Sequence, residues 1–160
     1  MLSPDLRKLL IAQIGHELGA HQLYPAIAIF FERQSLVRWG KLFRTQSAEE
    51  AQHAQKIIDF LVDNEVDFDL PALKATSTKF DSPAAAARRA LESERTVAGQ
   101  FDHAAKVAVA GGDHRGFQFL QWFIDEQVEE ERTMRGLLDL IDSGVNLFQA
   151  EPLLDGLAGE

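Results

Sequence analysis

Apolar side chains recur every three or four positions along most of the chain, which is the spacing of one face of an α-helix. Four long segments carry this pattern: Ser3-Pro4 to about Arg33, Leu36 to about Asn64, Ser82-Pro83 to Gly111-Gly112, and Asp113 to about Ser143-Gly144. A weaker amphipathic stretch from Asn146 to Leu157 predicts a short fifth helix. The period-two alternation of a strand does not persist between turn residues. The pattern therefore predicts an all-α protein.

Residue types at the ends of these segments support the boundaries. The predicted starts carry side chains that cap helix N-termini, namely Ser3, Ser35, Ser82 and Asp113. Proline follows Ser3 and Ser82 at the first helical position, where its missing N–H costs no hydrogen bond. The Gly111-Gly112 pair can adopt the left-handed backbone that ends a helix.

One connection is much longer than the others. Residues 65–81 could extend over roughly 55 Å at about 3.3 Å per residue, whereas a helix of about 28 residues rises only about 42 Å. The connection can therefore run the length of a bundle and place the start of helix three beside the start of helix two. Two short loops and one long crossover predict a four-helix bundle within a single domain spanning residues 1–160.

The core-facing stripe of each predicted helix is apolar at its ends and polar near its middle. The stripes are Leu10, Gln13, Glu17, Ala20, Tyr24, Ile27 and Phe31; Leu36, Trp39, Phe43, Gln46, Glu50, His53, Ile57 and Phe60; Ala87, Leu91, Glu94, Ala98, Phe101 and Ala105; and Leu120, Phe123, Gln127, Glu130, Met134, Leu137 and Ile141. A buried carboxylate is costly unless it is paired or bound to a metal. No Lys or Arg lies on the central part of any stripe. A pair of divalent metal ions is the simplest source of the missing positive charge.

Each polar position also has an ordinary explanation when it is taken alone. The Glu50-x-x-His53 pair shares a helix face, but most such pairs are solvated. Glu17 could be a boundary residue, and Tyr24 a packed aromatic. Glu94 stands among charged residues that could form an exposed salt-bridge face, and Gln127 and Glu130 border an acidic run. The coincidence of all four stripes carries the metal-site hypothesis.

A second set of acids lies one helical step away from two of the stripes. Glu49, Glu126 and Glu129, together with Glu130, could form a further metal site at the flank of the bundle. Exposed acids on two neighbouring helices explain the spacing equally well. The other histidines have no partner at ligand spacing and are predicted to lie on the surface: His16, His21, His103 and His114. Trp122 is interpreted mainly as a packing or interface residue.

The amino-acid composition excludes several kinds of metal site and binding partner. The chain has no cysteine, which excludes thiolate metal sites, iron–sulfur clusters and a cysteine nucleophile. Its formal charge of −9 disfavours nucleic-acid binding, which depends on clustered Lys and Arg. No apolar run approaches the roughly 18 residues of a membrane span, and charges in the first residues argue against a secretory signal. We therefore expect a cytoplasmic protein that binds neither nucleic acid nor membrane.

These residues resemble a ferritin over nearly the whole chain. The densest matches are Glu17 with Tyr24, the segment RTQSAEEAQHAQKIIDFL, Glu94 in LESERTV, and FLQWFIDEQVEEER. Within that superfamily the chain resembles the non-haem bacterial ferritins. Gln127-x-x-Glu130 stands where bacterioferritins carry a second Glu-x-x-His, and Gln52 lies in the region of their haem-binding methionine, so no haem is expected. A chain without cysteine also lacks the rubredoxin module of rubrerythrins.

The resemblance implies a ferroxidase that oxidises Fe(II) with O₂ or H₂O₂ and stores Fe(III) as mineral in a hollow homo-oligomeric cage, a 24-mer. It assigns Glu17, Glu50 and His53 to a first iron, and Glu50, Glu94 and Glu130 to a second, with Gln127 nearby. It places a third iron at Glu49, Glu126, Glu129 and Glu130, and makes Tyr24 and Trp122 electron donors. Pro25 departs from this picture, because a proline inside helix one should kink it and shift Tyr24.

Two other functions remain open from the residues. A di-metal oxygenase acting on an organic substrate would use the same ligands, but it needs an apolar pocket beside them. Bulky neighbours such as Phe43, Ile57 and Met134 leave little room for one. A purely structural bundle with water-filled polar layers is the third interpretation. Solution mass and iron content separate all three.

Overall fold

A computed structural model describes residues 2–157, and all of the regular structure in that range is helical. The helices are α1 (Pro4–Glu32), α2 (Val37–Asp63), α3 (Pro83–Ala110), α4 (His114–Asp142) and α5 (Leu147–Ala150), followed by the 3₁₀-helix η1 (Glu151–Gly156). The predicted all-α class is confirmed, as are the four long helices. The predicted fifth helix is present as α5 and η1.

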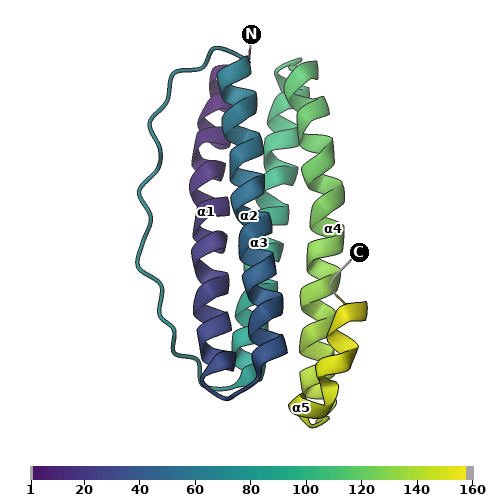
Figure 1. The fold of residues 1–160 in the computed structure, drawn as a ribbon. Helices are drawn as coiled ribbons and strands as arrows, with labels where there is room; N and C mark the ends of the chain where they lie inside the picture. The colour runs from purple at the N-terminus through teal and green to yellow at the C-terminus, as the bar shows by residue number, and fades with distance from the viewer. Residues whose placement is uncertain (1, 158–160) are drawn as a thin grey trace.

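The four long helices form a bundle with one crossover (Figure 1). α1 packs along α2, and α3 packs along α4. The segment between α2 and α3 runs down the outside of the bundle from one end to the other, so that α3 begins beside the start of α2 (Figure 1). The predicted crossover is therefore confirmed. The crossover makes α2 and α3 parallel. The midpoints of the four long helices therefore lie at the same height along the bundle axis (Figure 1).

Three of the four predicted N-caps are confirmed. Ser3 accepts a hydrogen bond from Leu6, Ser82 accepts one from Ala85, and Asp113 accepts one from Gly116 (the three donors being backbone N–H groups).

The prediction that Ser35 caps α2 is wrong. Ser35 has a left-handed backbone with φ 62° and ends α1 instead. Its N–H bonds the carbonyl of Glu32, and the N–H of Leu36 bonds that of Phe31, which is a Schellman motif. The buried Leu36 then precedes α2, without a side-chain cap.

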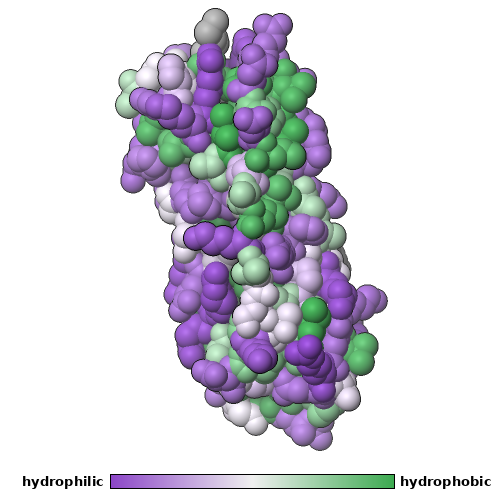
Figure 2. All heavy atoms as spheres, turned by 90° about the vertical axis from the view of Figure 1, so that its left-hand side faces the viewer, coloured by the Kyte–Doolittle hydropathy of each residue, from purple (hydrophilic) through white to green (hydrophobic). Residues whose placement is uncertain are grey.

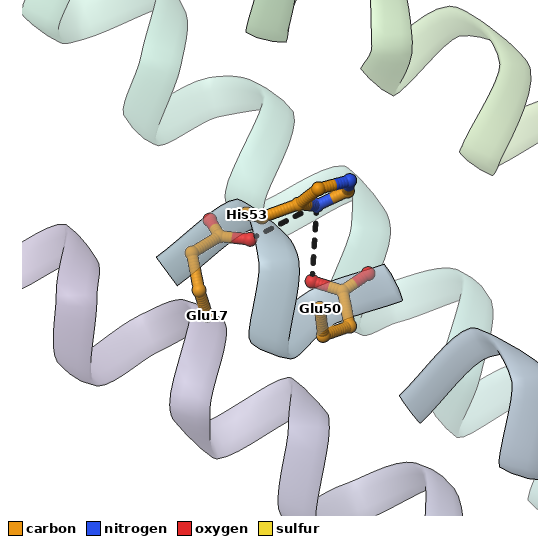
Figure 3. A group of neighbouring side chains, drawn as sticks. All are labelled: Glu17, Glu50 and His53. Carbon is orange, nitrogen blue, oxygen red and sulfur yellow. Dashed lines mark ion pairs between the residues drawn. The ribbon is translucent and has the colours of Figure 1, made fainter. Parts of the chain in front are cut away.

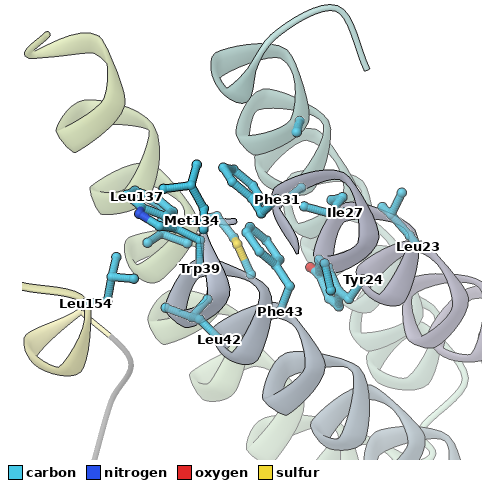
Figure 4. Packing of buried hydrophobic residues seen from close by; sticks show 14 of the residues in the cluster. Leu23, Tyr24, Ile27, Phe31, Trp39, Leu42, Phe43, Met134, Leu137 and Leu154 are labelled. Atoms are coloured by element: carbon cyan, nitrogen blue, oxygen red, sulfur yellow. The ribbon is translucent and has the colours of Figure 1, made fainter. Parts of the chain in front are cut away.

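Two apolar clusters fill the ends of the bundle. The first contains Phe31, stacked between Trp39 and Phe43 with ring centroids 5.3 and 5.7 Å away (Figure 4). The second contains Phe101, stacked on Phe123 at 4.6 Å. Buried polar residues lie between them, as the stripes predict, and only Phe60, Ala98 and Ile141 of the stripe positions are half-buried. The clusters hold the four helices in register around a polar middle layer.

The crossover face has its own surface character. Apolar side chains gather on it toward the end of the molecule where the N-terminus lies, and the rest is mainly hydrophilic (Figure 2). Leu70 and Leu73 of the crossover segment are 65% and 44% exposed. None of the described helices is both long enough and apolar enough to span a membrane.

Candidate metal centre

The first group of candidate ligands joins α1 to α2. Glu17 from α1 and Glu50 and His53 from α2 point toward one another (Figure 3). His53 Nδ1 lies 3.4 Å from Glu17 Oε2 and 3.4 Å from Glu50 Oε2. All three side chains are buried. One donor atom from each of the three lies within 4.8 Å of the others.

The second group joins α2 to the other pair of helices. Glu50, Glu94 and Glu130 each offer a carboxylate oxygen, and these oxygens also lie within 4.8 Å of one another. All three residues are buried. Glu50 belongs to both groups, so the two sets of ligands are adjacent and share a carboxylate. Adjacent groups that share a residue could hold two ions side by side.

Several buried atoms of the first group have no hydrogen-bond partner. They are Glu17 Oε2, Glu50 Oε1 and His53 Nδ1. A buried polar atom without a partner costs free energy, and of these three atoms Glu17 Oε2 and His53 Nδ1 lie 3.4 Å apart, where one metal ion could bind both. Oxygen and nitrogen ligands bind divalent metal ions at about 2.0–2.2 Å, so ligands on opposite sides of an ion lie about 4.3 Å apart. The donor set fits a metal ion of this kind.

Burial makes the carboxylates unusually basic. Desolvation is the largest cause in each case, and neighbouring carboxylates add to it. It raises the pKa of Glu94 to about 7, that of Glu50 to about 8 and that of Glu130 to about 9. Without a metal these acids therefore hold protons near neutral pH. A bound cation displaces those protons, because metal ligands must be ionised.

His53 responds in the opposite sense to its burial. Desolvation alone would lower its pKa, but attraction by the carboxylate groups of Glu17 and Glu50, each with an oxygen 3.4 Å from Nδ1, outweighs it and raises the pKa to about 10. In the metal-free protein the imidazolium is then the positive charge that faces Glu17 and Glu50. A metal ion takes over that role only after Nδ1 loses its proton.

A hydrogen-bond network orients Glu94. The Tyr24 hydroxyl donates to Glu94 Oε1, and Gln127 Nε2 donates to Glu94 Oε2 at 3.0 Å and to the Glu94 backbone carbonyl at 3.2 Å. Tyr24 and Gln127 are both buried. Gln127 therefore stands beside the second group as a hydrogen-bond donor to one of its carboxylates.

The flanking acids are arranged differently from the predicted third site. The third group of donor atoms consists of His53, Glu126 and Glu130, with His53 Nε2 4.0 Å from Glu126 Oε1. Glu49 is close enough for its pKa to be raised by burial and by Glu126 and lowered by His53. Glu129 is exposed and is in none of the three groups found among the described residues. In the third group, His53 takes the place predicted for Glu129.

Trp122 lies against the centre. Its ring meets that of His53 edge to face at 5.4 Å, and Lys56 Nζ lies 4.4 Å above it. Its side chain is 40% exposed, so Trp122 connects the imidazole of the centre to the surface between α2 and α4.

Sequence reasoning missed one contact beside the centre. His21 was expected on the surface, and that prediction is wrong: His21 is half-buried and its Nδ1 lies 2.8 Å from the carbonyl of Ser47 on α2. The expectation that His16, His103 and His114 are exposed is confirmed. Pro25, four residues after His21, has no N–H to bond the His21 carbonyl. It is therefore the sequence signal from which a contact at His21 could have been predicted.

Residues 7–143 match the family model described as a ferritin-like domain. Ferritin BfrB of Mycolicibacterium smegmatis is 40% identical over 151 residues, covering 94% of this chain and 83% of the relative. Bacterial non-heme ferritin of Staphylococcus haemolyticus is 32% identical over 142 residues, covering 89% and 86%. The open pore ferritin of the archaeon Archaeoglobus fulgidus superposes with a TM-score of 0.91 at 28% identity, covering 100% and 99%.

The helical bundle and its buried carboxylate–histidine layer define a ferritin-like carboxylate protein. The chain belongs to the ferritin family, and its relatives include proteins named bacterial non-heme ferritin. The predicted resemblance is thereby confirmed. Membership supports the expected class of function, which is iron storage.

Proposed function

We propose that this chain is the subunit of an iron-storage cage and oxidises Fe(II) at a two-ion centre before the iron is stored as Fe(III). Fe(II) is the substrate, and O₂ or H₂O₂ is the oxidant. Glu17, Glu50 and His53 hold one iron ion. Glu50, Glu94 and Glu130 hold the other. The proposed assembly is a 24-mer.

The sharing of Glu50 between two buried ligand groups is the observation that carries this proposal. Two ions bound in adjacent groups can each give one electron to the same oxidant molecule. Five of the six positions in these two groups are carboxylates, counting Glu50 once in each group. Hard oxygen ligands favour the ion of higher charge, so the site stabilises Fe(III) relative to Fe(II).

The proposed reaction balances with either oxidant. Two Fe(II) give two electrons to O₂, which takes two protons and leaves as H₂O₂. With H₂O₂ as oxidant, two electrons and two protons yield two water molecules. Burial raises the pKa of Glu50, Glu94 and Glu130, which favours their protonated forms before iron binds. Iron binding therefore releases protons at the centre.

Exposed apolar residues support the proposed assembly, and acids and aromatic residues beside the centre support the proposed third iron site and electron donors. The exposed Leu70 and Leu73 of the crossover segment are apolar surface that contacts between subunits would cover. The proposed third iron site consists of Glu126 and Glu130, which form one group of donor atoms with His53, and of Glu49 beside them. The exposed Glu129 would have to turn inward to join it. Tyr24 and Trp122 are the proposed electron donors. Each contacts a ligand of the centre.

The first test is anaerobic loading with Fe(II), followed by oxygen and optical detection of Fe(III). We expect Glu50→Ala to abolish rapid oxidation, because Glu50 belongs to both groups, and His53→Ala to slow it strongly. Asp63→Ala, which removes an exposed acid from the same helix, is the matched control and should oxidise iron as the unmodified protein does. Oxidation at the normal rate by Glu50→Ala and His53→Ala would refute the assigned centre.

The second test is solution mass together with iron content. A spherical assembly that retains iron supports the storage cage. A monomer or dimer with two metal ions per chain would favour the oxygenase alternative instead. Two hollows on the described surface, of about 500 and 900 Å³, are lined by residues outside the candidate centre, so neither provides that alternative with a substrate pocket beside the metal ligands.

A further inference from the structure

Pro25 lies inside α1 and leaves a backbone carbonyl without its usual donor. A proline has no N–H, so the carbonyl four residues earlier, that of His21, loses its hydrogen bond within the helix. α1 nevertheless continues through Pro25 to Glu32. An unpaired carbonyl in this half-buried position would cost free energy.

Ser47 of α2 supplies the missing donor. Its hydroxyl Oγ lies 2.7 Å from the His21 carbonyl oxygen and donates to it. The His21 ring returns the contact, since its Nδ1 lies 2.8 Å from the Ser47 carbonyl oxygen and 2.9 Å from Ser47 Oγ. Ser47 is only 5% exposed. The two residues therefore form a reciprocal pair of hydrogen bonds between the helices.

This contact lies one turn away from the first ligand group on both helices. Glu17 precedes His21 by four residues and Glu50 follows Ser47 by three, which correspond to rises of about 6 and 4.5 Å. Residues at these spacings share a helix face. Any sliding or rotation of α2 against α1 at Ser47 would therefore be transmitted to the separation of the Glu17 and Glu50 carboxylates.

We propose that Ser47 is a positioning residue: its hydroxyl replaces the donor that Pro25 lacks and fixes α2 against α1, so that Glu17, Glu50 and His53 are held at ligand spacing. The inference rests on the proposed metal centre. The hydrogen bonds of the Ser47 hydroxyl go to His21 and not to a ligand, so its effect on metal affinity is exerted through the packing of the two helices.

The test is an anaerobic Co(II) titration of the assembled protein, followed by visible absorption. We expect Ser47→Ala to weaken Co(II) binding about tenfold and to change the position or intensity of the Co(II) bands, because the ligand geometry changes. A purely structural role would lower the melting temperature and leave the bands of bound Co(II) unchanged. Thr45→Val is the matched control, since the Thr45 hydroxyl bonds only within its own helix, to Lys41.

Substitution of Pro25 gives the decisive comparison. In Pro25→Ala the new N–H can bond the His21 carbonyl, so the Ser47 hydroxyl becomes redundant. We expect Pro25→Ala/Ser47→Ala to bind Co(II) within about twofold of Pro25→Ala. Unchanged affinity and bands in Ser47→Ala would overturn the proposal, and so would an equal loss in both backgrounds.

Two further measurements, the folding of the variants and the melting of the metal-free proteins, test the proposal independently of Co(II) binding. If Ser47→Ala does not fold, recovery of folding in the double variant supports the compensation, and failure of both variants to fold overturns it. Melting of the metal-free proteins repeats the comparison without any metal: Ser47→Ala should lower the melting temperature more when Pro25 is present than in the Pro25→Ala background. Failure of Fe(II) oxidation would refute the proposed function in its own test and would leave this comparison unchanged.

Discussion

The hydroxyl of Tyr24 on α1 donates a hydrogen bond to the carboxylate of Glu94 on α3, two residues 70 positions apart in the chain. Gln127 Nε2 on α4 reaches the other oxygen of that carboxylate at 3.0 Å. Glu94 is thus oriented by donors on two helices. By contrast, Glu17 Oε2 and Glu50 Oε1 have no partner. The centre is asymmetric, because both carboxylate oxygens of Glu94 accept hydrogen bonds, whereas Glu17 is held through Oε1 alone, by Gln13 Nε2 at 2.7 Å.

The Tyr24–Glu94 contact predicts a stability effect. Tyr24→Phe removes a donor from a buried acid, so we expect the free energy of unfolding of the metal-free protein to fall by about 1–3 kcal/mol, measured by denaturant unfolding. At pH 9, where Glu94 with its pKa of about 7 is ionised, the same substitution should cost less in a Glu94→Gln background, because the charge-assisted bond is already lost. Equal costs in the two backgrounds would show that the hydroxyl acts through packing alone.

The buried carboxylate of Glu130 should destabilise the metal-free protein and yet be required for metal binding. Burial and the charges of Glu94, Glu50 and Glu49 raise its pKa to about 9, so its ionisation is unfavourable in the folded protein. Glu130→Gln should raise the melting temperature of the metal-free protein at pH 9 and reduce the anaerobic Co(II) stoichiometry of the two-ion centre from two to one. Asp139→Asn, which removes an exposed acid from the same helix, is the control and should change both quantities little. Retention of the full stoichiometry by Glu130→Gln would contradict its assignment.

The raised pKa values also predict how stability depends on pH. The ordinary glutamate value is 4.5, and the folded values for Glu50, Glu94 and Glu130 are about 8, 7 and 9. Their contribution to stability is complete below about pH 4.5 and is lost as the pH rises through the folded values. His53 acts in the same direction, because its folded pKa of about 10 exceeds its ordinary 6.5.

We therefore expect the metal-free protein to be less stable at pH 9 than at pH 6, as measured by denaturant unfolding. A saturating divalent ion should reduce or reverse this difference, since it binds the ionised ligands and only the folded state. Glu50→Gln should flatten the pH dependence of the metal-free protein. A metal-free stability that rises between pH 6 and pH 9, with no change in Glu50→Gln, would contradict the assigned titrations.

The convergence of the polar stripes could be predicted because helical spacing determines which residues face the core, and only four helices had to meet. Glu17 and Glu50 are buried for that reason. The local predictions that failed depend on contacts that spacing does not contain. Ser35 was assigned by residue type as a cap, but the short turn requires a left-handed residue there.

The contact of His21 with Ser47 likewise depends on how α1 and α2 pack. Pro25 signals that a carbonyl needs another donor, yet the sequence does not say which helix provides it. The flanking acids show the same limit, because their spacing places both Glu126 and Glu129 near the centre and does not say which of them approaches His53. The structure turns Glu126 inward.

The edge-to-face contact of Trp122 with His53, 5.4 Å between ring centroids, predicts an optical signal of metal binding. The chain has two tryptophans, and the other, Trp39, is buried in an apolar cluster with Phe31 and Phe43. Anaerobic Co(II) should quench mainly Trp122, because the ion binds beside the His53 ring and also converts the imidazolium to a ligand. Trp122→Phe should therefore abolish most of the Co(II)-dependent fluorescence change while Co(II) still binds, as followed by its visible absorption. An equal fluorescence change in Trp122→Phe would place the responding tryptophan at Trp39 and the bound ion away from His53.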